Sequence, residues 1–119
     1  MNKEAVRTRI EEIGIVPAIR VFSAEDALFA VKVVADSGIP IAEVTMTTPG
    51  AIGVISQIAR ERPEVIVGAG TILDTDAARR CLEAGAMFLS SPGLDVQVVE
   101  FAVKHNVVVF PGNQLRQAH

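Results

Sequence analysis

The sequence is poor in the residues that build disulfide scaffolds, aromatic cores and nucleic-acid surfaces. Its single cysteine, Cys81, excludes an internal disulfide and suits a reducing compartment. The 119-residue chain has no Trp or Tyr, only 4% aromatic residues and a net charge of −3. This charge gives no support for binding nucleic acid or an anionic membrane surface. No apolar run approaches the roughly 20 residues of a membrane span, and no signal region follows Met1, so we expect a cytoplasmic location.

What the chain does contain is aliphatic. Half of it is hydrophobic, mostly Val, Ile, Ala and Leu, which is typical of buried parallel strands. The length predicts a single domain over 1–119, with no visible linker. After a lead-in helix within 1–13, short apolar runs alternate with helical patterns. We predict strands at 15–21, 41–46, 65–70, 87–90 and 107–110.

Helix signals fill the intervals between these runs. Ser23 is predicted to start one helix, and Thr48 to cap another with Pro49 in its first turn. Asp74 or Thr75 is predicted to open a third helix that Gly85 closes, and a fourth is expected near 95–105. Side chains expected in the core or in helix packing include Phe22, Phe29, Cys81, Phe88 and Phe101.

Two parallel β/α architectures fit this repeat. One is a complete flavodoxin-like sheet, as in response-regulator receivers. The other is the front of a (βα)8 barrel, which typically needs about 250 residues. Length favours the first, but a receiver needs an acidic pair after strand one and an acceptor Asp after strand three. Here strand one ends in Arg20 and strand three in Gly68-Ala69-Gly70. The strand ends therefore favour a partial barrel of about five β/α units.

Glu43 is the most informative polar residue. It lies inside an apolar run, where a carboxylate is costly unless it is paired or hydrogen-bonded. Because strand side chains alternate, Glu43 and Thr45 share one face, which points inward in a barrel. One interpretation is a structural ion pair with Arg20 on the neighbouring strand. The other is a general acid/base.

Two loops at strand ends are also candidates for ligand contact. Gly68-Ala69-Gly70-Thr71 and Ser90-Ser91-Pro92-Gly93 follow the third and fourth strands. Glycine lets a ligand approach the backbone closely, but either loop is also consistent with an ordinary tight turn. Both readings stay open on the loops alone.

Five segments, taken in order, resemble the 2-keto-3-deoxy-6-phosphogluconate (KDPG) and 4-hydroxy-2-ketoglutarate (KHG) aldolases. The resemblance covers about residues 13 to 112. The segments that carry it are Ile15-Val16-Pro17-Ala18-Ile19-Arg20, Ala42-Glu43-Val44-Thr45-Met46-Thr47-Thr48-Pro49, Val67-Gly68-Ala69-Gly70-Thr71-Ile72-Leu73, residues 84–93 and Phe110-Pro111-Gly112.

The resemblance implies a (βα)8 barrel, usually a homotrimer, and a carbon–carbon lyase acting on a small 2-keto acid. It implies cleavage of KDPG, in carbohydrate metabolism, to pyruvate and glyceraldehyde 3-phosphate through a Schiff base with a lysine. It implies no metal and no organic cofactor. Glu43 matches the glutamate that moves protons. The matched substrate-binding positions are Arg20, Thr45, Thr47, Gly70, Thr71, Pro92 and Phe110.

Two departures from the family pattern stand out. Thr47 occupies a position where many members carry Arg, although others combine Thr there with an Arg on strand one, as this chain does with Arg20. The family's Schiff-base lysine lies on strand six, whereas Lys3, Lys32 and Lys104 all fall in predicted helices. We therefore expect weak or no activity from this chain alone, or a non-catalytic barrel fragment.

The end of the chain also differs from the family. Residues 113–119 form an atypical tail, consistent with a truncation, a frame change or an engineered end. A partial barrel exposes the outer edges of its first and last strands, which are rows of unpaired backbone groups. We expect the chain to self-associate through these edges.

Overall fold

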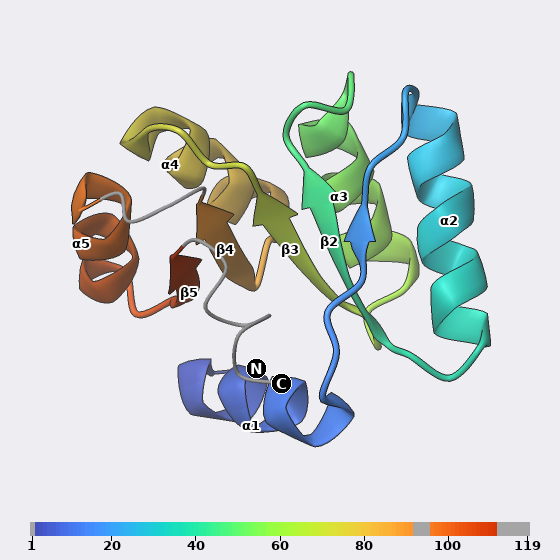
Figure 1. Ribbon diagram of the computed structural model, residues 1–119, viewed down its shortest axis with the longest axis horizontal. Coiled ribbons are helices and arrows are strands. Elements are labelled where there is room, and N and C mark those ends of the chain that lie inside the picture. The colour runs from blue at the N-terminus through green and yellow to red at the C-terminus, as the bar shows by residue number, and fades with distance from the viewer. Residues whose placement is uncertain (1, 92–95, 112–119) are drawn as a thin grey trace.

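The computed structural model describes residues 2–91 and 96–111. Pro92 and the atypical tail 113–119 therefore lie outside the described residues. Helices and strands alternate as the sequence predicts (Figure 1). The elements are α1 (Lys3–Ile13), β1 (Ala18–Ile19), α2 (Ala24–Asp36), β2 (Ile41–Thr45), α3 (Ala51–Glu61), β3 (Ile66–Gly70), α4 (Thr75–Ala84), β4 (Phe88–Ser91), α5 (Val96–Lys104) and β5 (Val108–Pro111).

The sheet distinguishes the two architectures. All neighbouring strands are parallel, and the spatial order is β1-β2-β3-β4-β5. A flavodoxin-like sheet has the order 2-1-3-4-5, with helices on both faces. The consecutive order is that of a β/α barrel, so the receiver-like alternative is wrong.

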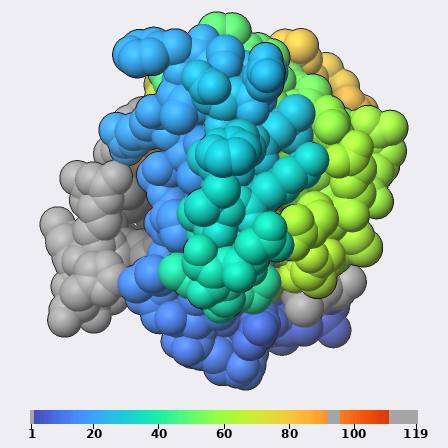
Figure 2. Space-filling model, turned by 90° about the vertical axis from the view of Figure 1, so that its right-hand side faces the viewer, coloured from blue at the N-terminus to red at the C-terminus, as the bar shows by residue number. Residues whose placement is uncertain are grey.

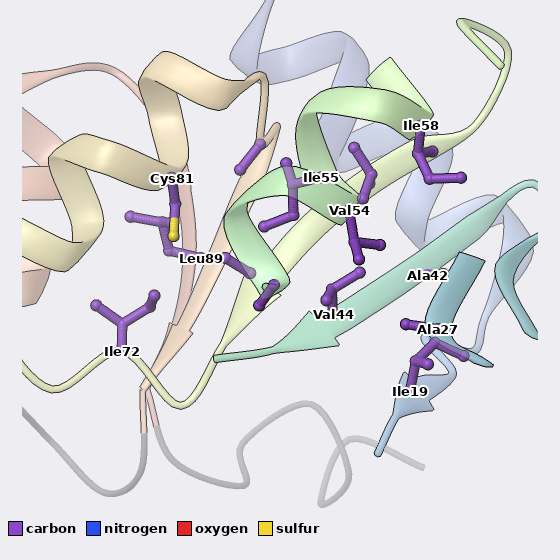
Figure 3. Close-up of a cluster of buried hydrophobic side chains, with 14 of the residues drawn as sticks. Ile19, Ala27, Ala42, Val44, Val54, Ile55, Ile58, Ile72, Cys81 and Leu89 are labelled. Atoms are coloured by element: carbon purple, nitrogen blue, oxygen red, sulfur yellow. The ribbon is translucent and has the colours of Figure 1, made fainter. Parts of the chain in front are cut away.

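The connecting helices α2 to α5 all cover one face of the sheet. Buried residues of these helices pack with the outward-facing residues of β2, β3 and β4 in a single cluster (Figure 3). Val54 and Ile58 of α3, for example, belong to the same cluster as Ala42 and Val44 of β2. Helices confined to one face leave the other face of the sheet to line a barrel interior.

The helix α1 covers the opposite face at the end where the strands begin (Figure 1). Its Val6 and Ile10 are buried in a second cluster that contains one inward residue from each of four strands, namely Ile41, Ile66, Phe88 and Val108. Asn2 caps the helix by accepting a hydrogen bond from the N–H of Ala5 at 2.8 Å. The lead-in helix thus plugs the base of the partial barrel.

Most of the predicted helix ends are confirmed. Ser23 caps α2 by accepting a hydrogen bond from the N–H of Asp26, and Asp74 caps α4 through the N–H of Ala77. Gly85 ends α4 in the left-handed conformation. Within the described residues, no helix is long and apolar enough to cross a membrane.

Two predicted boundaries are wrong. The first strand is only Ala18–Ile19, shorter than 15–21, because it pairs on one side alone and Pro17 has no N–H to give. The helix α3 begins at Ala51 behind Gly50, and its N-cap makes no side-chain hydrogen bond. The expected cap, Thr48, instead donates to the carbonyl of Val21 at 3.1 Å.

The predicted burial of two phenylalanines is also wrong. Phe22 is 96% exposed and Phe29 is 70% exposed, whereas Phe88 is fully buried and Phe101 packs against the main cluster. Phe29 lies on the side of α2 opposite to its buried residues, so the helix cannot present both to the sheet.

Candidate active site

Glu43 projects along the inner face of the sheet toward the end of β3. Its strand pairs with β3 so that Glu43 lies beside Gly68 and Thr45 beside Gly70. A Cβ built on Gly70 would overlap the Oε2 of Glu43 and lie 2.5 Å from its Cδ. The carboxylate therefore occupies the space that any side chain at position 70 would fill. Residue 70 must be glycine for Glu43 to adopt this position.

An aromatic wall lies on the other side of Gly68. A Cβ at this position would overlap the ring of Phe88. Phe88 contacts Phe110 edge to face, with the ring centroids 5.8 Å apart. Two glycines, spaced by one residue, thus make room on one face for a carboxylate and a phenyl ring. Glu43 is half-buried in this partly apolar setting.

The residue after Gly70 has an unusual backbone. Thr71 has φ of 59°, in the left-handed region, which is an outlier for a β-branched residue. Such a conformation costs on the order of 1–3 kcal/mol and tends to occur at functional sites. The carbonyl of Gly70 accepts a hydrogen bond from the N–H of Met46, and the N–H of Ile72 donates to the carbonyl of Ser90. These bonds tie Thr71 between the ends of β2 and β4.

Thr45 adds a hydroxyl to the same edge. It is only 3% exposed, and its Oγ1 has no hydrogen-bond partner among the described residues. Ser91 of β4 also has a buried hydroxyl without such a partner. Buried polar atoms are nearly always satisfied in proteins, so each of these hydroxyls can hydrogen-bond to a water or a ligand at its strand end. Thr45 pairs with Gly70, and its side chain lies on the same face of β2 as that of Glu43.

Arg20 and Thr47 meet at a separate hollow on the same edge. The hollow has a volume of about 390 Å³ and is lined by Arg20, Val21, Phe22, Thr47 and Pro49. The hydrogen bond from Thr48 to Val21 joins the two loops that carry these residues. Arg20 is exposed, so its guanidinium is available to an anion. No local sequence pattern predicts this hydrogen bond between the two loops.

The structure brings most, but not all, of the predicted residues into these two places. Glu43, Thr45, Gly70 and Thr71 form one group, and Arg20 and Thr47 the other. Phe110 belongs to neither group: it is half-buried and packs against Phe88 in the cluster that α1 covers.

The remaining candidates contribute less to a site. Cys81 is buried, with its Sγ 3.4 Å from the Sδ of Met46, and burial raises the pKa of its thiol to about 11. It is therefore a core residue rather than a nucleophile. Over the described ranges, no group of three or more His, Cys, Asp or Glu side chains could hold a metal.

Sequence comparison connects this geometry to known proteins. The family model for KDPG and KHG aldolase matches residues 6–117. The chain belongs to the KDPG/KHG aldolase family. The KHG/KDPG aldolase of Escherichia coli (strain K12) is 39% identical over 98 residues, covering 82% of this chain and 46% of the relative. The 2-dehydro-3-deoxy-phosphogluconate aldolase of Treponema pallidum (strain Nichols) is 34% identical over 103 residues, covering 87% of this chain and 49% of the relative.

Solved aldolases have the same fold over the matched part. The KDPG aldolase of Zymomonas mobilis ATCC 29191 aligns with a TM-score of 0.75 and 30% identity, covering 86% of this chain and 51% of that chain. A KDPG aldolase from Legionella pneumophila, with pyruvate captured as a covalent carbinolamine, aligns with a TM-score of 0.74 and 27% identity, covering 87% and 52%. The chain spans about half the length of the curated relatives it matches. The fold is therefore that of the first β/α units of a TIM-type barrel.

Proposed function

We propose that this chain carries the proton-transfer and keto-acid-binding part of a class I aldolase site. The reaction is cleavage of KDPG to pyruvate and glyceraldehyde 3-phosphate. The observation that carries the proposal is the carboxylate of Glu43, which lies over Gly70, one residue before the strained Thr71. In parallel β/α barrels, catalytic groups gather at this end of the strands.

Each residue has a defined task in this chemistry. A lysine amine attacks the 2-keto carbon, and loss of water gives an iminium. The C3–C4 bond then breaks, its electrons flow into the iminium, and the C4 hydroxyl loses its proton. Glu43 accepts and returns the protons of these steps. Thr45, Gly70 and Thr71 contact the pyruvyl group.

We assign the polar end of the substrate to the hollow between Arg20 and Thr47. Arg20 and Thr47 line it together, and an exposed guanidinium suits a carboxylate or phosphate. Pro92 and Phe110 keep the substrate-binding roles that the resemblance implies. No metal or organic cofactor enters the proposal.

The amine of the Schiff base is the missing part. Lys3, Lys32 and Lys104 lie in α1, α2 and α5, and none lies on a strand. In a β/α barrel the reacting groups come from strand ends and the loops after them, so no lysine here is positioned to form the imine. We infer that the chain alone binds pyruvate weakly and cleaves KDPG slowly or not at all.

The test separates binding from covalent chemistry. The ¹³C resonances of pyruvate should broaden when the chain is added, and borohydride should trap no adduct detectable by intact mass. Glu43→Gln should weaken the broadening, whereas Glu100→Gln, on α5, should leave it unchanged. A trapped adduct on any lysine would refute the inferred lack of Schiff-base chemistry. If the chain does not broaden the pyruvate resonances, it does not bind the keto acid, and the alternative of a non-catalytic barrel fragment holds.

Self-association completes the proposal. The outer edges of β1 and β5 have no strand partner within the described sheet. Such edges pair readily with other chains, so we propose a homo-oligomer in a cytoplasmic setting, a trimer if the family's assembly is kept. Sedimentation velocity should show a species larger than a monomer.

A further inference from the structure

Ser90 places a hydroxyl on the inner face of β4. Side chains alternate along a strand, and Phe88 of β4 lies on the inner face in the cluster that α1 covers, whereas Leu89 packs with the helices on the other face. Ser90 therefore shares the inner face with Phe88. Its neighbour on β5 is Phe110, which packs against the same inner cluster. Ser90 is half-buried, so it borders the interior without being sealed in it.

Ser90 lies on one side of Gly70, and Thr45 lies on the other. The register of β3 with β4 puts Ser90 beside Gly70, as the register of β2 with β3 puts Thr45 there. The N–H of Ile72 donates to the carbonyl of Ser90 at 3.1 Å and fixes this alignment. Neighbouring strands are about 4.8 Å apart, and the carboxylate of Glu43 lies over Gly70. The Ser90 hydroxyl and this carboxylate therefore border one space, a strand's width apart.

The hydroxyl of Ser90 is available to a ligand. No side-chain hydrogen bond among the described residues uses it. A serine hydroxyl can donate one hydrogen bond, which is what an anionic oxygen requires. Ser91 differs, because strand alternation turns it to the helix-covered face, on the same side as Leu89. A ligand over Gly70 can therefore reach the first serine but not the second.

The position of β4 relative to the hollow of Arg20 and Thr47 decides which end of a substrate lies near Ser90. The strands β1 and β4 lie on opposite sides of β3: β1 is on the right of Figure 1 and β4 on the left, and Figure 2 looks onto the side of α2 and β1. A keto acid with its polar end in the hollow extends across β2 toward β3 and β4. Its pyruvyl end, which carries the carboxylate, therefore lies nearest Ser90.

The carboxylate of the keto acid needs hydrogen-bond donors on this side of the site. The strands β3, β4 and β5 contain no Lys or Arg, so within the described sheet only neutral groups can supply these donors. A hydroxyl that donates to a carboxylate makes a charge-assisted hydrogen bond, about twice as strong as a neutral one. Thr71 is already assigned to the pyruvyl group, and Ser90 provides a second hydroxyl one strand further along.

We propose that Ser90 donates a hydrogen bond to the carboxylate of the keto acid and so gives this site a preference for 2-keto acids over their uncharged esters. The inference rests on the proposed aldolase function, because it concerns a ligand of the same site. Ser90 binds and orients the pyruvyl group, and it transfers no proton in the reaction.

The test is titration of the full chain with pyruvate and with methyl pyruvate, which lacks the charged carboxylate, followed by ¹³C line broadening. Ser90→Ala should weaken pyruvate binding by roughly fivefold or more, because a hydrogen bond to a charged group is lost. Methyl pyruvate should bind the wild type more weakly than pyruvate, and Ser90→Ala should narrow this difference. Ser91→Ala removes the same hydroxyl from the opposite face, so it is the matched control and should leave both titrations unchanged. Circular dichroism checks that each variant is folded.

Failure of this inference can be distinguished from failure of the proposed function. If the wild type binds pyruvate and Ser90→Ala binds it equally well, or loses both ligands to the same extent, the role of Ser90 is wrong while the proposed function stands. If Ser91→Ala weakens pyruvate binding as much as Ser90→Ala does, the effect arises from strand packing, and the role of Ser90 is again wrong. A wild type that does not bind pyruvate would overturn the proposed function and this inference together.

Discussion

The two ends of the inner sheet face differ sharply in chemistry. Where the strands begin, the inward residues are aliphatic or aromatic, buried and covered by α1. Where they end, the same face presents the carboxylate of Glu43, the unsatisfied hydroxyl of Thr45 and the left-handed Thr71. One end is optimised for packing, and the other keeps polar groups and strain that packing alone would remove. This division of stability and function is expected of β/α barrels.

The largest expected effect is at the packed end. Phe88→Ala should destabilise the chain by about 3–5 kcal/mol, because it leaves a cavity between Gly68, Phe110 and α1. Phe29→Ala is the matched control and should cost less than about 0.5 kcal/mol, because that ring is exposed. Urea unfolding measures both. Equal losses would mean that the base of the barrel is not the core.

The next effect tests the close approach at the polar end. Gly70→Ala should cost about 1 kcal/mol, the low end for an added methyl group, because the flexible carboxylate of Glu43 can move aside but loses its position. Adding Glu43→Ala should recover much of that loss, since residues in contact are not additive. Urea unfolding of the two single variants and the double variant measures this coupling. Simple additivity would show that Glu43 does not lie over Gly70.

A smaller effect of opposite sign is expected at the strained residue. Thr71→Gly should be neutral or stabilising by up to ~1 kcal/mol, because glycine adopts positive φ freely but loses more chain entropy on folding. Pyruvate-induced line broadening should fall in the same variant, because the hydroxyl is gone. Thermal melts and pyruvate titration give the two readings. A loss of stability in Thr71→Gly would show that Thr71 is held for packing rather than for function.

The smallest effect concerns the surface, where neither end of the sheet is involved. Arg62 bridges Asp36 at 2.9 Å and Glu64 at 2.7 Å, and its hydrogen bond holds the pKa of Glu64 below the ordinary 4.5. A lowered carboxyl pKa contributes stability above the unfolded-state value, and this is lost as the pH falls through the folded-state value. Arg62→Gln should therefore lower the melting temperature slightly at pH 7, and the difference should vanish in acid. A difference that persists at pH 2 would have another cause.

The sequence predicted the β/α alternation and most helix ends, because these depend on local patterns. Ser23, Asp74 and Gly85 act through neighbours within a turn, and apolar periodicity locates the buried strands. Thr48 resembled a cap just as well, but its hydroxyl bonds to Val21, which is remote in sequence. Only the packed structure determines which of two local options such a residue takes.

The candidate site was predictable in its residue types but not in its contacts. An acidic residue in an apolar strand and glycines at the next strand end pointed to Glu43 and Gly70. That the two are in contact depends on the β2–β3 register, which no single strand specifies. The hollow of Arg20 and Thr47 likewise depends on the meeting of two loops. The exposure of Phe29 follows from helical geometry, since it lies opposite Ala27 and Val31.

The position of α1 has a consequence for how the chain folds during synthesis. Val6 and Ile10 emerge from the ribosome before the strands they pack against, and their cluster is complete only when Val108 has been made. The helices α2 to α5 pack on strands adjacent to them in sequence, so their units can form in order. The helix α1 thus docks last, although it precedes these strands in sequence, and its protection from hydrogen exchange would report that the strands are in place.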